Sequence, residues 1–221
     1  MLEGFEQDKA NTKVDCSRRQ ALRIGLAAFA GGLAARANAA SGNPELLTGL
    51  LKAHEQKLDE DARYTQCALK AAEEGYAQVA ALFRASVASA KVHSRSLASL
   101  IKEQGGTPKA DGAKPTAAST KDNLAVAAKD ASYEAETMYP NLIKEAQAEN
   151  NGIAVRALSY AKAAVTEHVK LYNSALDHLE EWKVAGKTFS VCPVCGIATM
   201  GMSTEVCPIC HTPKGMFTKI V

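Results

Sequence analysis

Residues 154–179 read AVRALSYAKAAVTEHVKLYNSALDHL, and at alternating steps of four and three this stretch is apolar or aromatic except for one histidine. The positions in the series are Ala154, Leu158, Ala161, Val165, His168, Tyr172, Ala175 and Leu179. This spacing places the side chains on one face of an α-helix. The stretch therefore predicts a long helix over about 152–184, with one face turned towards a protein interior.

Three further segments show the same helical periodicity, and the chain before residue 187 has hardly any strand signal. Gly75 separates the first two helices, and Pro140 is expected to disturb the third. The predicted helices cover 44–74, 76–103 and 120–150. Four long amphipathic helices indicate an all-α fold built around a four-helix bundle.

The linker between the second and third helices, GGTPKADGAKPTAAS at 105–119, is rich in Gly, Pro and Ala. A helix of about 28 residues is roughly 42 Å long. A linker of about 15 residues reaches at most roughly 50 Å, so it is long enough to recross the bundle. The sequence therefore predicts a ferritin-like connection rather than a short helix–helix turn.

Two C-P-x-C segments, 192–195 and 207–210, lie near the C-terminus and are separated by eleven residues. Paired knuckles of this kind can bring four thiolates around one metal ion, and tetrahedral S₄ sites hold zinc or iron. The spacing alone does not choose between these two metals. In an oxidising compartment the same four cysteines could instead form two disulfides, which is the alternative interpretation.

The N-terminus has the features of a twin-arginine secretory signal. The segment SRRQALR at 17–23 precedes a mostly small, apolar run at 24–35, and Ala37-Asn38-Ala39 supplies a cleavage pattern. We expect residues 1–39 to be removed, the folded chain to be exported to the periplasm, and no stable membrane span to remain. Export of a folded chain lets a metal be loaded beforehand in the reducing cytoplasm. The alternative is an uncleaved membrane anchor.

Three segments follow from these signals: the signal peptide at 1–39, the bundle at 40–185 and the metal-binding domain at 186–221. Removing the six basic and four acidic residues of 1–39 from totals of 26 and 24 leaves 20 of each. A mature chain without net charge gives no reason to expect a nucleic-acid partner. The remaining unpaired cysteine, Cys67, is expected to be a small buried hydrophobe.

Ionisable residues interrupt the apolar stripes near the middle of all four predicted helices. They are Lys57, Glu60, His93, Glu134 and His168. Burying such groups is costly unless they pair with one another or bind something. The pattern indicates a present or former functional centre, with simple core polarity as the alternative.

Several stretches of the chain resemble rubrerythrins over essentially the whole length after the signal. They are Arg63-Tyr64-Thr65, EGYAQVAALF at 74–83, Tyr133-Glu134 with Met138-Tyr139-Pro140, and CPVCG and CPICHTPKGMF in the tail. The resemblance implies a ferritin-like bundle with a di-iron site, followed by a rubredoxin-like domain with iron at Cys192, Cys195, Cys207 and Cys210. It also implies homodimers and peroxide reduction, and it favours iron over zinc in the tail.

The residues that should hold two irons depart from the family pattern. A di-iron bundle needs a Glu from each of two helices and a Glu-x-x-His from each of the other two. Lys57, Ala90, Thr137 and Val165 stand where the family has carboxylates, and no Glu-x-x-His occurs in this sequence. A di-iron centre is therefore not expected.

Two arrangements could stand in place of the di-iron centre. In the first, which we favour, Lys57 takes the electrostatic place of the metal and pairs with Glu134 or Glu60. In the second, His93, Glu134 and His168 hold a single iron. An ammonium group close by opposes cation binding, and this is the reason for preferring the first.

The sequence thus predicts an exported non-haem iron protein with one iron in the four-cysteine site. One-electron transfer at this iron to an unidentified redox partner is the first functional hypothesis. A peroxide-reducing oxidoreductase that uses a residual bundle metal is the second. The third hypothesis is a structural protein whose tail is stabilised by zinc.

Overall fold

The structure, a computed structural model, describes residues 44–220 except 114, 185, 187 and 203. The predicted signal at 1–39 lies outside the described residues. In the described part of the chain, no helix is long and apolar enough to cross a membrane.

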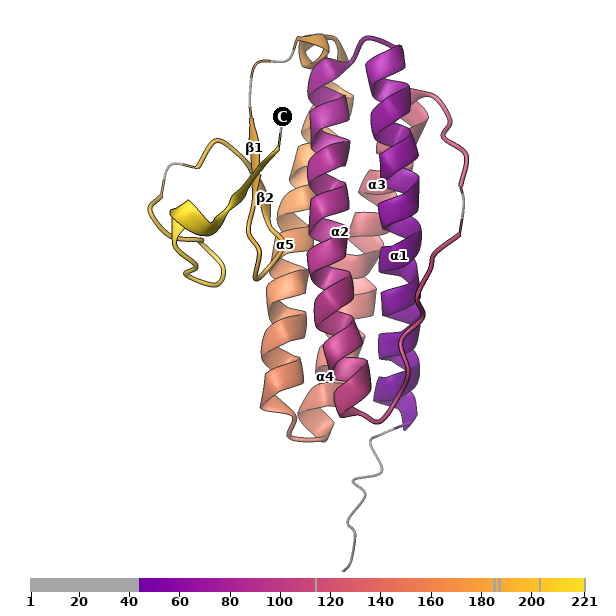
Figure 1. The fold of residues 1–221 in the computed structure, drawn as a ribbon, viewed down its shortest axis with the longest axis vertical. Coiled ribbons are helices and arrows are strands. Elements are labelled where there is room, and N and C mark those ends of the chain that lie inside the picture. The colour runs from indigo at the N-terminus through magenta and orange to yellow at the C-terminus, as the bar shows by residue number, and fades with distance from the viewer. Residues whose placement is uncertain (1–43, 114, 185, 187, 203, 221) are drawn as a thin grey trace, which may run out of the picture. The chain divides into compact units, whose positions relative to one another are not determined.

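Four long helical stretches run side by side and form the bundle (Figure 1). Their bounds are α1 Pro44–Glu73, α2 Ala77–Glu103, α3 Thr120–Tyr133 continued by α4 Tyr139–Ala148, and α5 Gly152–Asp177. The last helix ends earlier than predicted. A 3₁₀ turn, η2 at Leu179–Lys183, follows it and buries Trp182 against Phe189, with ring centroids 6.4 Å apart.

The third helical stretch contains a π-helical turn, η1 at Glu134–Met138. The Tyr139 N–H donates to the Glu134 carbonyl, five residues back, which is the wide π spacing. Pro140 has no N–H to continue the ordinary ladder, so the disturbance predicted at this proline takes the form of a wide turn just before it. This turn carries Glu134, the one candidate carboxylate of the third helix.

The crossover segment at 105–119 lies along α1 over most of its length (Figure 1). Lys109 forms an ion pair with Glu55, the Ala113 N–H donates to Asp59 Oδ1 (2.6 Å), and the Thr120 N–H donates to Glu74 Oε2 (2.9 Å). Glu55 and Asp59 lie in α1, and Glu74 directly follows its last residue. The linker therefore recrosses the bundle, as the ferritin-like connection requires.

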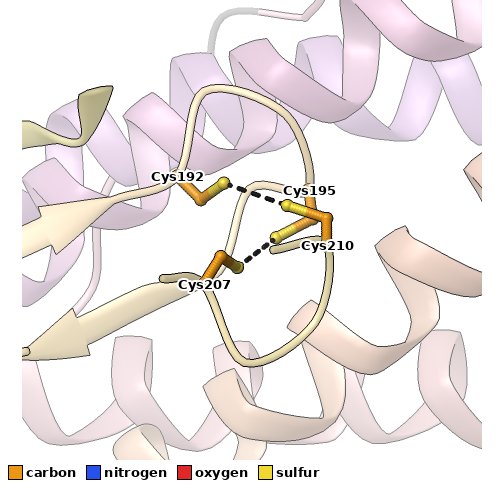
Figure 2. Close-up of side chains that lie close together, drawn as sticks. All are labelled: Cys192, Cys195, Cys207 and Cys210. Atoms are coloured by element: carbon orange, nitrogen blue, oxygen red, sulfur yellow. Dashed lines mark hydrogen bonds between the residues drawn. The ribbon is translucent and has the colours of Figure 1, made fainter. Parts of the chain in front are cut away.

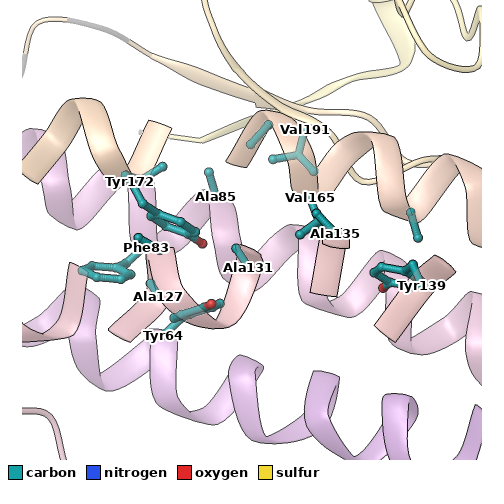
Figure 3. Close-up of a cluster of buried hydrophobic side chains, with 14 of the residues drawn as sticks. Tyr64, Phe83, Ala85, Ala127, Ala131, Ala135, Tyr139, Val165, Tyr172 and Val191 are labelled. Atoms are coloured by element: carbon teal, nitrogen blue, oxygen red, sulfur yellow. The ribbon is translucent and has the colours of Figure 1, made fainter. Parts of the chain in front are cut away.

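Small residues dominate the interior of the bundle, and a few aromatic rings fill the space between them (Figure 3). The rings of Tyr64, Phe83 and Tyr172 have centroids 5.8 to 6.4 Å apart. The Tyr172 hydroxyl donates to Ser86 Oγ (2.7 Å), so these two buried hydroxyls satisfy one another. Alanines facing these rings let the helices approach closely.

The C-terminal segment forms a small antiparallel sheet in the order β2-β1-β3. Its strands are β1 Phe189–Val191, β2 Ala198–Met200 and β3 Thr218–Ile220, with Phe189 opposite both Met200 and Ile220. A short 3₁₀ turn, η3 at Lys214–Met216, precedes β3. Phe189, Val191 and Ala198 belong to the same buried core as the helices. The all-α bundle with an appended four-cysteine domain is therefore confirmed.

Candidate metal centre

The four knuckle cysteines converge on one point (Figure 2). Their Sγ atoms all lie within 4.8 Å of one another, and the pairs Cys192–Cys210 and Cys195–Cys207 are 3.5 Å apart. A tetrahedron with metal–sulfur bonds of about 2.3 Å has sulfur–sulfur edges of about 3.8 Å. The described cysteines form no disulfide, and 3.5 Å is far longer than an S–S bond of about 2 Å. The four side chains thus fit a tetrahedral S₄ metal site.

Both knuckles use the same backbone turn. The Gly196 N–H donates to the Cys192 carbonyl (3.1 Å), and the His211 N–H donates to the Cys207 carbonyl (3.0 Å). Gly196 and His211 both have positive φ, 76° and 60°. Histidine tolerates this conformation better than branched residues do, so the second knuckle closes without glycine.

Backbone amides point at the sulfur atoms. The thiol of Cys195 lowers the pKa of Cys192 to about 4 against the opposing effect of burial, and the amides of Cys195 and Val194 act in the same direction. Amide donors that stabilise a thiolate also tune the reduction potential of a bound iron. The site therefore has the donors, the geometry and the surrounding dipoles that an iron or zinc ion requires.

The second candidate site, inside the bundle, is centred on an ion pair. Lys57 Nζ lies 2.5 Å from both carboxylate oxygens of Glu134 and 2.8 Å from Glu60 Oε2. All three side chains are buried, with exposures of 1 to 5 %. The amide of Gln56 donates to Glu134 (2.5 Å) and to Glu60 (3.3 Å). The structure thus shows the lysine paired with both carboxylates predicted as its alternative partners.

The charges of this cluster balance one another. Burial acts to lower the pKa of Lys57, but the carboxylates of Glu134 and Glu60 outweigh it and raise the pKa. Burial acts to raise the pKa of Glu60, but the ammonium outweighs it and lowers the pKa to about 2. Burial and the neighbouring Glu60 raise the pKa of Glu134. The ammonium of Lys57 therefore balances the carboxylate of Glu60, and Glu134 holds its proton more strongly than an ordinary carboxyl group does.

The two stripe histidines contact the C-terminal domain. His93 Nε2 lies 3.0 Å from the Cys195 carbonyl oxygen, and the Ala198 N–H donates to His168 Nε2 (3.0 Å). We call residues 195–198 the docking loop. The imidazole rings lie 6.4 Å apart and are inclined by 30°. The Nε2 atoms of His93 and His168 are thus both hydrogen-bonded to backbone groups of the docking loop.

The cavity between these groups is small. It measures about 10 Å³ and is lined by Lys57, Glu60, Glu134 and both histidines, together with neighbouring core residues. That is about the room one water molecule requires. Among the described residues, the knuckle cysteines are the only group of His, Cys, Asp or Glu close enough to share a metal ion. The ligand atoms of His93, Glu134 and His168 are therefore not close enough to one another to share a metal ion.

Sequence reasoning missed three participants in these sites. Gln56 lies beside the stripe rather than in it, and no periodicity marks its bonds to Glu134 and Glu60. The backbone groups of Cys195 and Ala198 carry no side-chain signal for their contacts with histidines 102 and 30 positions away.

His168 leads to a prediction about acid stability. Burial, followed by His93 and Lys57, lowers its pKa from 6.5 to about 3. Below pH 6.5 the unfolded chain therefore binds a proton that the native chain does not, and stability falls as the pH falls. The slope is about 1.4 kcal/mol per pH unit, or about 2 kcal/mol between pH 6.5 and about 5.

Denaturant unfolding across this range should show the loss in the wild type and a flatter profile in His168→Gln. The Gln oxygen can accept from the Ala198 N–H but does not titrate. Both proteins keep the four cysteines, so acid release of metal affects them alike. Parallel profiles for the two proteins would contradict the prediction.

A ferritin-like bundle joined to a four-cysteine site defines a two-domain metalloprotein. The rubrerythrin family model matches residues 50–176, more than half of the chain. Nigerythrin of Nitratidesulfovibrio vulgaris is 37 % identical over 158 residues, covering 71 % of this chain and 77 % of that protein. Rubrerythrin-2 of Clostridium acetobutylicum is 31 % identical, covering 70 % and 85 %. The chain belongs to the rubrerythrin family and is a non-haem iron protein.

Solved structures agree with this assignment. The fully reduced, all-ferrous state of nigerythrin superimposes with a TM-score of 0.74 at 35 % identity, covering 79 % of this chain and 86 % of that chain. The bacterioferritin of Desulfovibrio desulfuricans, at 19 % identity and a TM-score of 0.57, covers 62 % of this chain and 81 % of its own. The second likeness shows the bundle fold alone.

Proposed function

We propose that this protein transfers single electrons through an iron bound by Cys192, Cys195, Cys207 and Cys210, and that its bundle is a scaffold without a di-iron centre. When bound, an iron with four thiolate ligands supplies a one-electron couple. Four protein ligands leave no open position for a substrate. The function that fits such a closed site is electron transfer.

The contact of Lys57 with Glu134 and Glu60 carries this proposal. Two ferrous ions bring four positive charges, which di-iron bundles balance with several carboxylates. Here an ammonium already occupies the two carboxylates that reach the middle of the bundle. The residues present therefore do not fit two irons.

Metal content and a visible spectrum, measured on protein purified from its native compartment, test the proposal. We expect about one iron per chain, with thiolate-to-iron absorption and no second iron signal. Two or more irons per chain would overturn the scaffold role. Zinc alone, from cells supplied with iron, would instead support a structural tail.

A second candidate is peroxide reduction at a single bundle iron held by His93, Glu134 and His168. It is favoured by one observation, that these three residues line the same cavity. Peroxide-dependent reoxidation of the reduced protein separates the candidates. Electron transfer alone predicts slow reoxidation that is unchanged in Glu134→Gln, whereas a peroxidase predicts fast reoxidation that this variant abolishes.

Changing Lys57 to Glu is expected to raise metal uptake by the bundle. The substitution removes the competing ammonium and adds a third carboxylate beside Glu60 and Glu134. Ferrous ion uptake beyond the four-cysteine site, measured by competition with a chelator, checks this. Lys57→Met is the matched control, since it removes the cation without adding a ligand. Uptake by Lys57→Glu equal to that of the wild type would count against the role given to Lys57.

Export and assembly complete the proposal. The twin-arginine pattern at 17–23 supports delivery of the folded, metal-loaded chain to the periplasm. Family membership supports a homodimer. The mass and N-terminal sequence of protein from the periplasm test cleavage near Ala39, and light scattering tests the dimer. The redox partner is to be sought among proteins of the same compartment.

A further inference from the structure

Two hydrogen bonds join the docking loop to the bundle, and their backbone partners have fixed roles. A carbonyl oxygen only accepts and an amide N–H only donates. The Cys195 carbonyl therefore requires a proton on His93 Nε2, 3.0 Å away. The Ala198 N–H requires a lone pair on His168 Nε2, also 3.0 Å away. The two histidines must hold opposite tautomers.

The tautomer of His168 decides which of its nitrogens can bind a metal. A neutral imidazole carries one proton and one lone pair on its two ring nitrogens. The ring is 6 % exposed, and burial, followed by His93 and Lys57, keeps it neutral at neutral pH by lowering its pKa to about 3. Because the lone pair of Nε2 faces Ala198, the proton lies on Nδ1. Nδ1 then has no lone pair for a metal ion.

We propose that the Ala198 N–H holds His168 in the Nδ1–H tautomer, so that docking of the loop and ligation of a bundle metal by His168 exclude each other. The proposal rests on the proposed function, in which the bundle holds no metal, and adds a second physical reason why no metal binds there. Nε2 is engaged by the loop, so Nδ1 is the nitrogen left for an ion in the internal cavity. Rotating the His168 ring, or moving its proton from Nδ1 to Nε2, would leave the buried Ala198 N–H without its acceptor.

The loop fits closely enough to enforce this choice. Gly196 has a φ of +76°, and a Cβ at this position would lie 2.5 Å from His93 Nε2. The Gly196 carbonyl also lies near the His168 ring and acts to raise its pKa. It is the Ala198 N–H, however, that has hydrogen-bonding geometry with Nε2. The Ala198 N–H requires a lone pair on Nε2, and the tautomer that this contact selects can be measured.

Nitrogen-15 NMR of the full chain tests the tautomers directly. The four-cysteine site is loaded with Zn²⁺ to avoid paramagnetism, and histidine ring nitrogens are read from long-range ¹H–¹⁵N spectra. His168→Gln and His93→Gln each remove one set of signals and so assign them. We expect a protonated Nδ1 in His168 and a protonated Nε2 in His93. A protonated Nε2 in His168, or averaging between its two nitrogens, would overturn the proposal.

That failure is distinct from failure of the proposed function. If His168 carries its proton on Nε2 and iron analysis still gives one iron per chain, the tautomer proposal falls and the electron-transfer role stands. If a second iron is found in the iron-loaded protein, the proposed function falls, whatever tautomer the zinc-loaded chain shows.

Amide hydrogen exchange at Ala198 supplies a second measurement. His168→Gln keeps an acceptor and should leave exchange close to that of the wild type. His168→Leu removes the acceptor and should speed exchange by about tenfold or more, the effect of losing one hydrogen bond. Exchange at Ala198 that is equal in the Leu variant and the wild type would contradict the hydrogen bond itself. The NMR test on the wild type decides the matter even if the Leu variant does not fold.

Discussion

Replacing Lys57 with alanine is expected to lower the free energy of unfolding by about 3–5 kcal/mol, a large part of the stability of a domain of this size. The substitution leaves Glu60 and Glu134 buried without their cation. Gln56 still donates to both side chains, but a neutral amide does not replace the cation that the buried acids require. The loss should shrink at acidic pH, where the acids left without Lys57 are protonated and no buried charge lacks a partner. Urea unfolding at neutral and acidic pH measures both effects.

Two control variants separate this mechanism from a general effect of removing a lysine. Lys70→Ala breaks an exposed ion pair with Glu73 and should leave stability unchanged within error. The triple change Lys57→Met, Glu60→Leu and Glu134→Met removes all buried charge and should recover most of the loss. A change of less than about 1 kcal/mol in Lys57→Ala would show that the buried pair does not have the importance given to it here.

Cys207→Ser is expected to abolish metal binding in the tail and to unfold the segment from β1 to β3. This segment has only two aromatic residues for its core, Phe189 and Phe217, and structural metal sites of this kind contribute about 10–16 kcal/mol of binding free energy. We expect metal content to fall to near zero. Limited proteolysis should then cut between Trp182 and Val221 and leave the helices intact.

Cys67→Ala is the matched control for the cysteine variant. Cys67 is buried in α1, away from the knuckles, and burial raises the pKa of its thiol to about 11. This variant should keep its metal and its protease-resistant tail. Retention of metal by Cys207→Ser, with His211 or another residue replacing the lost thiolate, would contradict the four-cysteine assignment.

Much of the fold could be predicted because its signals are local. Periodic stripes and glycine breaks gave the helices to within a few residues, except at the end of α5, where a 3₁₀ turn and the burial of Trp182 intervene. The length of 105–119 predicted the crossover from chain geometry alone. The π turn at Glu134–Met138 was not predicted in form, because proline indicates a disturbed helix but not how the chain resolves it.

The candidate sites were predictable to different degrees. The knuckle spacing is short and specific, so the four cysteines were identified together. The pairing of Lys57 could be anticipated from its place in an apolar stripe. The docking of the loop on His93 and His168 could not, since it joins backbone groups of one domain to side chains of another. Such contacts depend on the packing of whole elements and leave no pattern in the sequence.

The docking loop also changes what the metal stabilises. It is bonded to α2 through His93 and to α5 through His168, helices from opposite halves of the bundle. A ligand that binds only the native state stabilises every part that must be folded for it to bind. The affinity and free concentration of the metal should therefore raise the melting temperature of the helices as well as that of the tail. The small domain and the large one are thermodynamically coupled through these contacts, although the helices can stay folded when the tail does not.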